Sequence, residues 1–328
     1  MPKVLITTIP FGDKNKKPLQ MLKDSNIEYV INPFNKKITE SELISIINEF
    51  DGLIAGTEPI TRDVFNSASK LKIIGRVGIG LDNVDLLYAS KKNITVTYTP
   101  DAPAPAVAEL TIAIMLSLLR SVHISNDEMH NGRWHRYFGR RLSEVEIGII
   151  GLGRIGTRVI KHIRAFNSKK IMVNDLNTDK ETYENQNLIW TSKEDIYEKA
   201  DVISLHLPLT KLTSNMINLE KLLLMKKDAI IINTSRGGII NEKDLYEVMK
   251  LGKFCGAGID VFDKEPYDGP LNNIQRCLLT SHMGSMSEDC RSKMEIEATQ
   301  DVINYFNNDK INCLVPEYEY QIQQNLAK

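Results

Sequence analysis

The sequence predicts an α/β protein built from two doubly wound parallel sheets. Short runs of β-branched and aliphatic residues alternate with amphipathic stretches, which is typical of strands and helices that wrap a parallel sheet. The alternation occurs in two series, separated by a proline-rich connector at residues 98–110. A chain of 328 residues also exceeds what one hydrophobic core usually holds. We therefore expect two domains, each with its own sheet.

The first series contains five expected strands with helical segments between them. The strands lie at 4–7, 28–31, 52–55, 72–76 and 94–97, and the helical segments lie near Leu19 and at 41–50, 62–69 and 84–91. The second series contains six expected strands, which are enough for one complete doubly wound sheet. These strands lie at 146–150, 171–174, 202–205, 229–233, 256–259 and 278–280.

The connector between the two series is hinge-like. Pro100, Pro103 and Pro105 oppose both a helix and a central strand there. The apolar residues 106–119 that follow are too few to span a bilayer, so we expect a buried helix. A second long helical pattern at 288–306 can return the chain to the first domain, and the polar tail from residue 317 carries little structural signal.

Composition argues against several classes of function. The 41 Lys and Arg residues nearly balance 42 Asp and Glu residues, so no net charge draws the chain to nucleic acid or to a membrane. Residues 1–13 lack the sustained apolar run of a signal peptide. The four cysteines are widely spaced without a C-x-x-C pair, which favours free thiols over a disulfide frame or a zinc site. We expect a cytoplasmic protein without a metal.

A glycine-rich turn follows the first strand of the second series. The sequence GLGRIG places Gly151, Gly153 and Gly156 between that strand and a helix whose apolar face includes Ile155. In this context the first glycine allows a tight turn, the second lets the backbone approach a pyrophosphate, and the third lets the helix pack closely. The helix N-terminus offers free N–H groups to the phosphates. The next strand ends at Asp175, whose carboxylate can bind an adenine ribose and repels a 2′-phosphate, so we expect NAD rather than NADP.

Three polar side chains follow strands of the second series. Arg236 follows the fourth strand, Glu265 the fifth and His282 the sixth. The carboxyl ends of parallel strands meet at one edge of the sheet, where doubly wound folds bind ligands. This set suits the oxidation of a hydroxyl group next to a carboxylate by hydride transfer. His282 serves as general base or acid, Glu265 fixes its tautomer, and Arg236 grips the carboxylate.

Five motifs occur in the order and spacing of the D-isomer-specific 2-hydroxyacid dehydrogenases, the group that includes phosphoglycerate dehydrogenase. They are GIIGLGRIG, SLHLPLT, NTSRGG, GIDVFDKEP and SHMGS, and the sequence resembles this family over nearly its whole length. The resemblance implies a Rossmann NAD-binding domain inserted in a flavodoxin-like split catalytic domain, an active-site cleft between them, and a homodimer. It places the catalytic domain at 1–100 and 290–328 and the NAD-binding domain at 101–289.

The resemblance also implies roles for individual positions. Arg236 would be the substrate anchor, Glu265 the partner and His282 the acid/base. The residues that would bind the cofactor are Gly151, Gly153, Arg154, Ile155, Gly156, Asp175, His206, Pro208, Thr213, Thr234, Ser235, Arg236, Asp260, His282 and Gly284. Those that would bind the substrate are Arg76, Val77, Gly78, Ile79, Arg236 and His282. Backbone N–H groups of 77–79 would form an anion nest for the substrate carboxylate, and Asp260 would hydrogen-bond the nicotinamide carboxamide.

Several alternatives stay open at this point. The basic stretch 133–142 fits either a phosphorylated substrate or contact with a partner subunit. The segment between Gly156 and Asp175 is one residue longer than in the family pattern, so Asn174 competes with Asp175 as the ribose ligand. Glyoxylate-like, hydroxypyruvate-like and 3-phosphoglycerate-like acids are all candidate substrates. Two other functions are also possible: an NAD(H)-sensing protein like the corepressors of this fold, and a phosphite-type dehydrogenase. Arg76 argues against the phosphite-type dehydrogenase, because that enzyme carries a lysine at this position.

Overall fold

The computed structural model describes residues 1–176 and 188–327, which form two compact units. Unit 1 comprises Met1–Pro103 and Ser285–Lys328, and unit 2 comprises Ala104–Gly284. Unit 2 is therefore inserted into unit 1. The borders between the units along the chain lie after residues 103 and 284, whereas the resemblance predicted borders after residues 100 and 289. The second border lies earlier because helix α11 (Glu288–Asn307) belongs to unit 1 from its first residue, where Glu288 pairs with Lys14.

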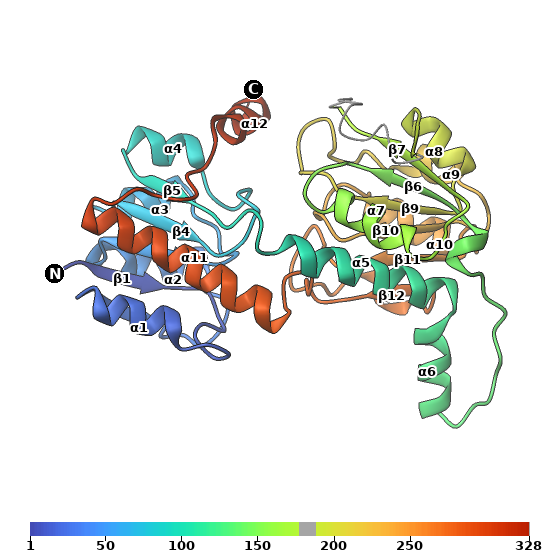
Figure 1. Ribbon diagram of the computed structural model, residues 1–328, viewed down its shortest axis with the longest axis horizontal. Coiled ribbons are helices and arrows are strands. Elements are labelled where there is room, and N and C mark those ends of the chain that lie inside the picture. The colour runs from blue at the N-terminus through green and yellow to red at the C-terminus, as the bar shows by residue number, and fades with distance from the viewer. Residues whose placement is uncertain (177–187, 328) are drawn as a thin grey trace. The chain divides into compact units, whose positions relative to one another are not determined.

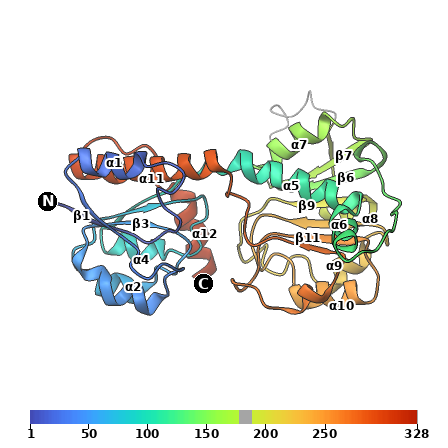
Figure 2. The same ribbon diagram turned by 90° about the horizontal axis from the view of Figure 1, so that it is seen from below.

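Unit 1 contains a five-stranded parallel sheet in the order β2-β1-β3-β4-β5, which is the flavodoxin-like order. The strands are β1 (Lys3–Ile6), β2 (Glu28–Ile31), β3 (Gly52–Ala55), β4 (Ile73–Arg76) and β5 (Thr95–Thr97). All residues of β3 and β4 are buried, as expected for strands covered on both faces. Helices α1 (Lys17–Asp24) and α11 cover one face, and α2 (Glu40–Ile46), α3 (Arg62–Ser67) and α4 (Leu86–Lys91) cover the other (Figure 1 and Figure 2).

Unit 1 ends in a helix that the sequence did not predict. Helix α12 (Glu317–Ala327) contacts α4, and the segment before it pairs with β5 through an antiparallel bridge between Thr97 and Leu314 (Figure 1). Val315 is buried in the core of unit 1 and the half-buried Tyr320 packs against it. The polar tail is thus a docked element, and the expectation that it carries little information is wrong.

Unit 2 contains a seven-stranded parallel sheet in the order β12-β11-β10-β9-β6-β7-β8. The strands are β6 (Glu146–Ile150), β7 (Lys170–Asn174), β8 (Leu188–Trp190), β9 (Val202–Leu205), β10 (Ile230–Asn233), β11 (Gly256–Ile259) and β12 (Cys277–Leu279). Counted from β6, this is the Rossmann order 3-2-1-4-5-6 with one more strand at its end. The sequence missed β8, because an edge strand of three residues carries too little alternation. The strand order reverses between β6 and β9, so ligands are expected at the carboxyl ends of this pair.

Helices cover both faces of the second sheet. Helices α5 (Ala104–Leu119) and α7 (Gly156–Arg164) lie on one face, and α8 (Lys193–Lys199), α9 (Leu219–Leu224) and α10 (Glu242–Lys250) on the other (Figure 2). The expected buried helix is confirmed as α5, although it already begins before Pro105. Proline is tolerated there because the first turn of a helix needs no N–H bond. Short 3-10 turns occur at Ile47–Glu49, Leu142–Glu144 and Pro270–Asn273.

Helix α6 (Val122–His130) follows α5 after a bend of 68° and was not predicted. With the segment that follows it, α6 extends away from the sheet of unit 2 (Figure 1). No single helix of the described chain is long and apolar enough to cross a membrane, and only the bent pair of α5 and α6 passes by length and composition. All four cysteines are free, as expected.

Candidate active site

The glycine-rich turn connects β6 to α7 at the point where the strand order reverses. Gly151 has a φ of +99°, and a Cβ atom there would lie 2.2 Å from the carbonyl oxygen of His206. At Gly156 a Cβ atom would lie 2.0 Å from the carbonyl oxygen of Gly151. Both positions therefore need glycine. At Gly153, by contrast, a Cβ atom would meet nothing within 4 Å. Open space beside a helix N-terminus fits the phosphates of a dinucleotide.

The acid after β7 faces this turn. Oδ2 of Asp175 accepts a hydrogen bond of 2.5 Å from the backbone N–H of Leu152. The side chain of Asn174 instead donates to the carbonyl oxygen of Thr191, 2.7 Å away and next to β8. Of the two competing positions, Asp175 has its carboxylate beside the glycine turn, so we retain it as the proposed ribose ligand.

His206 lies beneath the turn, at the end of β9. Its backbone N–H donates to Ile150, and its ring lies 3.5 Å from where a Cβ of Gly156 would be. Burial lowers the pKa of His206 to about 3, so the ring is neutral at physiological pH. Nε2 is 2.9 Å from Oγ of Ser204, and Nδ1 has no hydrogen-bond partner within the described chain. The structure thus places this side chain as a buried support of the turn.

The loop after β9 is closed by threonine side chains. Oγ1 of Thr213 donates to the carbonyl oxygen of Pro208 at 2.6 Å and accepts from the N–H of Thr210 at 2.7 Å. Arg154 and Ile155 lie between the second and third glycines, at the entry to α7. Arg154 and Ile155 therefore border the switch point between β6 and β9, whereas Pro208 and Thr213 lie in the loop that follows β9.

Asn233, which was not predicted from the sequence, organises the loop after β10. Asn233, which is 2% exposed, accepts hydrogen bonds at Oδ1 from N–H and Oγ of Ser235. Its Nδ2 donates to the carbonyl oxygen of Arg236 at 2.8 Å. Oγ1 of Thr234 is 2.8 Å from Oγ1 of Thr111 in α5. An asparagine at the end of an otherwise apolar strand was the available signal, since such a buried amide needs partners.

Asp260 holds the loop that carries the histidine. Its side chain is buried and accepts three hydrogen bonds, from Oγ1 of Thr280 (2.6 Å), the N–H of Met283 (2.7 Å) and the N–H of Gly284 (2.9 Å). Its carbonyl oxygen accepts from the N–H of His282 at 2.9 Å. A carboxylate offers about four acceptor sites, so about one is left for the expected nicotinamide contact. Most of the acceptor capacity of the Asp260 carboxylate therefore holds the loop of residues 280–284.

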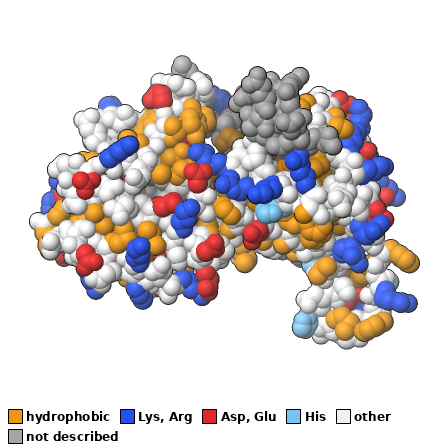
Figure 3. Space-filling view, in the orientation of Figure 1, with side chains coloured by type: hydrophobic (Ala, Val, Ile, Leu, Met, Phe, Trp, Pro, Cys, Tyr) orange, Lys and Arg blue, Asp and Glu red, His pale blue; other side chains and the backbone are white. Residues whose placement is uncertain are grey.

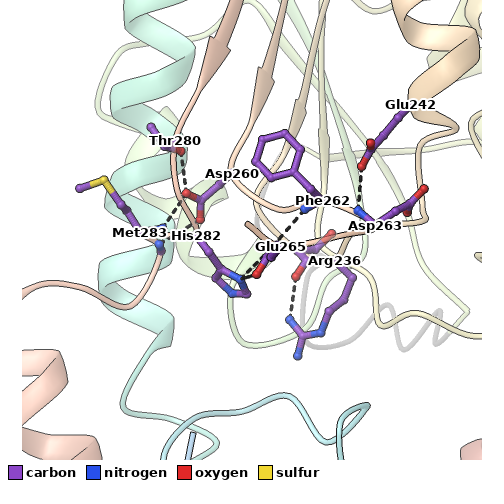
Figure 4. Close-up of polar contacts among 11 residues, drawn as sticks. Arg236, Glu242, Asp260, Phe262, Asp263, Glu265, Thr280, His282 and Met283 are labelled. Atoms are coloured by element: carbon purple, nitrogen blue, oxygen red, sulfur yellow. Dashed lines mark hydrogen bonds and ion pairs between the residues drawn. The ribbon is translucent and has the colours of Figure 1, made fainter. Parts of the chain in front are cut away.

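The structure brings His282 and Glu265 together. Nδ1 of His282 lies 2.8 Å from Oε2 and 3.0 Å from Oε1 of Glu265, and Oε1 also accepts from the N–H of Phe262 (Figure 4). His282 has a φ of +53°, a left-handed conformation that costs a non-glycine residue about 1 kcal/mol or more. The Asp260 bonds on both sides hold it there. With its Nδ1 held by Glu265 and 41% of its side chain exposed, His282 can offer Nε2 to a ligand.

Arg236 lies in the neighbouring loop at the same edge of the sheet. A Cβ atom at Gly237 would lie 2.1 Å from the backbone of Phe262, so the loops after β10 and β11 touch without a side chain between them. Figure 4 shows the Arg236 side chain extending beside Glu265 and His282. Nη1 of Arg236 donates to the carbonyl oxygen of Ser235 at 2.6 Å. The three residues expected to carry the chemistry therefore share one edge.

A further acid, Glu242, supports this loop. Oε1 of Glu242, at the start of α10, accepts a 2.7 Å hydrogen bond from the N–H of Asp263 (Figure 4). The pKa of Glu242 is raised by burial and by the charges of Asp263 and Glu265, and burial also raises the pKa of Asp263. Glu242 thus anchors the chain two residues before Glu265.

In unit 1 the expected substrate loop follows β4. Arg76 is 6% exposed, and its Nη1 donates to the carbonyl oxygen of Val77. The N–H of Val77 donates to Ala55 at 2.9 Å, and the N–H of Gly78 donates to Oγ1 of Thr99 at 2.8 Å and to Arg76 at 3.1 Å. Two of the three N–H groups of the expected anion nest are therefore engaged inside unit 1, and the nest of 77–79 stays a prediction. The guanidinium of Arg76 is the positively charged group next to this loop.

The described geometry matches a known family. The model of the "D-isomer specific 2-hydroxyacid dehydrogenase, NAD binding domain" matches residues 112–284, which is most of unit 2. The chain belongs to this family of D-isomer specific 2-hydroxyacid dehydrogenases. Unit 2 is its NAD-binding domain and contains the open turn at Gly153.

Individual members of the family cover both units. The chain is 40% identical over 260 residues to D-3-phosphoglycerate dehydrogenase of Methanocaldococcus jannaschii, covering 77% of this chain and 49% of that protein. It is 35% identical over 278 residues to hydroxypyruvate reductase of Thermotoga maritima, covering 82% and 89% of the two chains. The structure of NAD+-bound 3-phosphoglycerate dehydrogenase from Entamoeba histolytica has a TM-score of 0.80 at 27% identity, covering 96% and 99%. The chain thus spans about half the length of the first relative and most of the other two.

Proposed function

We propose that this chain is an NAD-dependent dehydrogenase that interconverts a small 2-hydroxy acid and its 2-oxo acid. The single observation that carries the proposal is the His282–Glu265 pair at 2.8 Å, on the sheet edge shared with Arg236. The relatives named above for acting on phosphoglycerate or hydroxypyruvate support the class of substrate.

In this proposal His282 and Glu265 handle the proton, and Arg236 and Arg76 hold the acid group. Bound NAD supplies the hydride acceptor at its nicotinamide ring. Glu265 keeps the proton of His282 on Nδ1, so Nε2 takes the hydroxyl proton during oxidation and returns it during reduction. Arg236 donates to the developing oxygen charge and to the carboxylate, and Arg76 is a second ligand of the carboxylate. Gly151, Gly153, Gly156 and Asp175 would hold the dinucleotide.

A panel of 2-oxo acids tests this function. We expect wild-type protein to reduce at least one of glyoxylate, pyruvate, hydroxypyruvate and 3-phosphohydroxypyruvate with NADH, and to prefer NADH over NADPH by about tenfold or more because Asp175 repels a 2′-phosphate. The panel also decides whether the substrate is phosphorylated. Binding of NADH without reduction of any acid would overturn the proposal and favour an NAD(H)-sensing protein.

We also propose that α6 and residues 131–141 bind a second copy of this chain. Trp134 is 81% exposed and Phe138 is fully exposed, and Figure 3 shows hydrophobic and basic side chains gathered over this extension. Arg133 pairs with Glu128, Arg140 with Asp201 and Arg141 with Glu144, so three charges of the basic stretch are used locally. This favours the subunit contact over a phosphate site, since exposed aromatic side chains mark protein interfaces.

Sedimentation of the double variant Trp134→Ala, Phe138→Ala tests the contact. Wild-type protein should sediment as a dimer at micromolar concentration and the variant as a monomer. A monomeric wild type, or a variant that remains dimeric, would contradict it.

A further inference from the structure

The last helix holds the loop that follows the expected substrate site. Oε1 of Gln323 in α12 accepts a 2.9 Å hydrogen bond from the N–H of Leu86. Its Nε2 donates to the carbonyl oxygens of Leu81 (3.1 Å) and Val84 (2.7 Å). One side-chain amide thus binds three backbone groups of a single loop, residues 81–86. The same loop begins two residues after Ile79.

This loop contains the residue that links Arg76 to the rest of the sheet edge. Oδ1 of Asn83 lies 3.5 Å from Nε of Arg76, and its Nδ2 donates to the carbonyl oxygens of Glu58 (2.7 Å) and Gly56 (3.2 Å), which follow β3. The carbonyl groups that Gln323 binds lie on either side of Asn83, so Gln323 fixes the backbone from which this side chain extends.

The bonds to Gln323 also complete the start of α4. Asp85 is its N-cap and accepts from the N–H of Tyr88, which leaves the N–H of Leu86 to another acceptor. Oε1 of Gln323 supplies it. Gln323 is only half-buried, so water can replace the amide when it is removed. Its loss should therefore loosen the loop without unfolding unit 1.

We propose that Gln323 is a positioning residue for the substrate. It acts through loop 81–86 and Asn83 on Arg76, so α12 sets how well unit 1 holds the acid group. The inference rests on the proposed function, in which Arg76 binds the substrate carboxylate.

Steady-state kinetics of Gln323→Met test the inference, with Gln321→Met as control on the exposed side of the same helix. Methionine keeps the length of the side chain and loses all three bonds. We expect the KM for the best 2-oxo acid to rise about five- to tenfold, as for the loss of roughly one net hydrogen bond, with kcat and the KM for NADH unchanged. A second variant, Gln323→Glu, keeps the acceptor for Leu86 and loses both donors, and its KM should rise as well.

Amide hydrogen exchange gives a readout that needs no activity. The N–H of Leu86 should exchange about tenfold faster in Gln323→Met than in wild type or Gln321→Met. If wild type reduces no 2-oxo acid, the proposed function fails, while unchanged exchange at Leu86 would overturn the loop contact by itself. If wild type is active and Gln323→Met has the wild-type KM for the 2-oxo acid, the positioning role is wrong. The role is also wrong if kcat falls and the KM for NADH changes at the same time.

Discussion

The two sheet edges of the molecule hold their polar residues in different ways. In unit 2, His282 is held by Asp260 and by Glu265, which lies 17 positions before it. In unit 1, the loop behind Arg76 is held by Gln323, which lies 242 positions after Leu81. The contacts of His282 are made between the ends of two adjacent strands, β11 and β12. The contacts of Gln323 form only because the chain returns to unit 1 after it has completed unit 2. The comparison predicts that changes at the unit 2 edge act on turnover and that changes at the unit 1 edge act on substrate affinity.

Replacement of the histidine should give the largest effect. His282→Ala removes the proposed general acid/base, and we expect kcat to fall about 10²- to 10⁴-fold while NADH binding is unchanged. Stopped-flow or steady-state assays with NADH fluorescence titration measure both. His162→Ala, in the last turn of α7 and away from its glycine turn, is the matched control and should keep wild-type turnover. Full activity of His282→Ala would remove the acid/base role.

Replacement of the unit 1 arginine should come next and should act on a different constant. Arg76→Lys keeps the charge but loses the planar fork, so we expect the KM for the 2-oxo acid to rise about ten- to hundredfold, as for a charge-assisted hydrogen bond worth about 1.5–3 kcal/mol. The KM for NADH should not change. A fall in kcat alone, with an unchanged KM for the acid, would break the division of labour between the two edges.

Substitutions at two glycines of the turn should distinguish an effect on cofactor binding from an effect on folding. Gly153→Ala places its Cβ in open space, so the melting temperature should be unchanged while the Kd for NADH rises about tenfold, or 1.4 kcal/mol. Gly156→Ala places its Cβ 2.0 Å from the carbonyl oxygen of Gly151 and should lower the melting temperature instead. Calorimetry and NADH titration distinguish the pair. Unchanged NADH affinity in Gly153→Ala would mean that the phosphates lie elsewhere.

The smallest effect should be on stability, at Glu242. The folded protein raises the pKa of Glu242 above its ordinary value of 4.5 through burial and through the charges of Asp263 and Glu265, so it binds that proton more tightly than the unfolded chain does. The free energy of unfolding therefore loses a contribution as pH rises above about 4.5. Glu242→Gln keeps the acceptor for Asp263 and should match wild type near pH 4 and exceed it at pH 7.

Urea unfolding between pH 4 and pH 8 measures this difference, with Glu247→Gln on the exposed side of α10 as control. A difference between Glu242→Gln and wild type that is the same at every pH would show that the charge of Glu242 does not matter.

Local patterns predicted most of the fold and most of the unit 2 site. Buried parallel strands are continuous apolar runs, so strands such as β9 and β10 could be placed from the sequence, as could the turn at Gly151. Strand β8 and helix α12 were missed, since a short edge strand and a polar helix show their role only through tertiary contacts. These omissions explain why the role of Gln323 could not be predicted.

The details of the site that the sequence left open have one common cause. The sequence identifies which group is polar, but not which hydrogen bonds already use it. The N–H groups of Val77 and Gly78 and the carboxylate of Asp260 were expected to face ligands, and the structure engages them with Ala55, Thr99 and the 280–284 loop. Asn233 was overlooked for the same reason.

Transfer of deuterium from NADH tests the central claim most directly. Wild-type protein is incubated with the best 2-oxo acid and with NADH that carries deuterium at both C4 positions, and the acid is analysed by NMR. The account predicts a 2-hydroxy acid of the D configuration with deuterium at C2 and its hydroxyl proton derived from solvent. Bound NADH that is never oxidised, or a product without deuterium at C2, would contradict it.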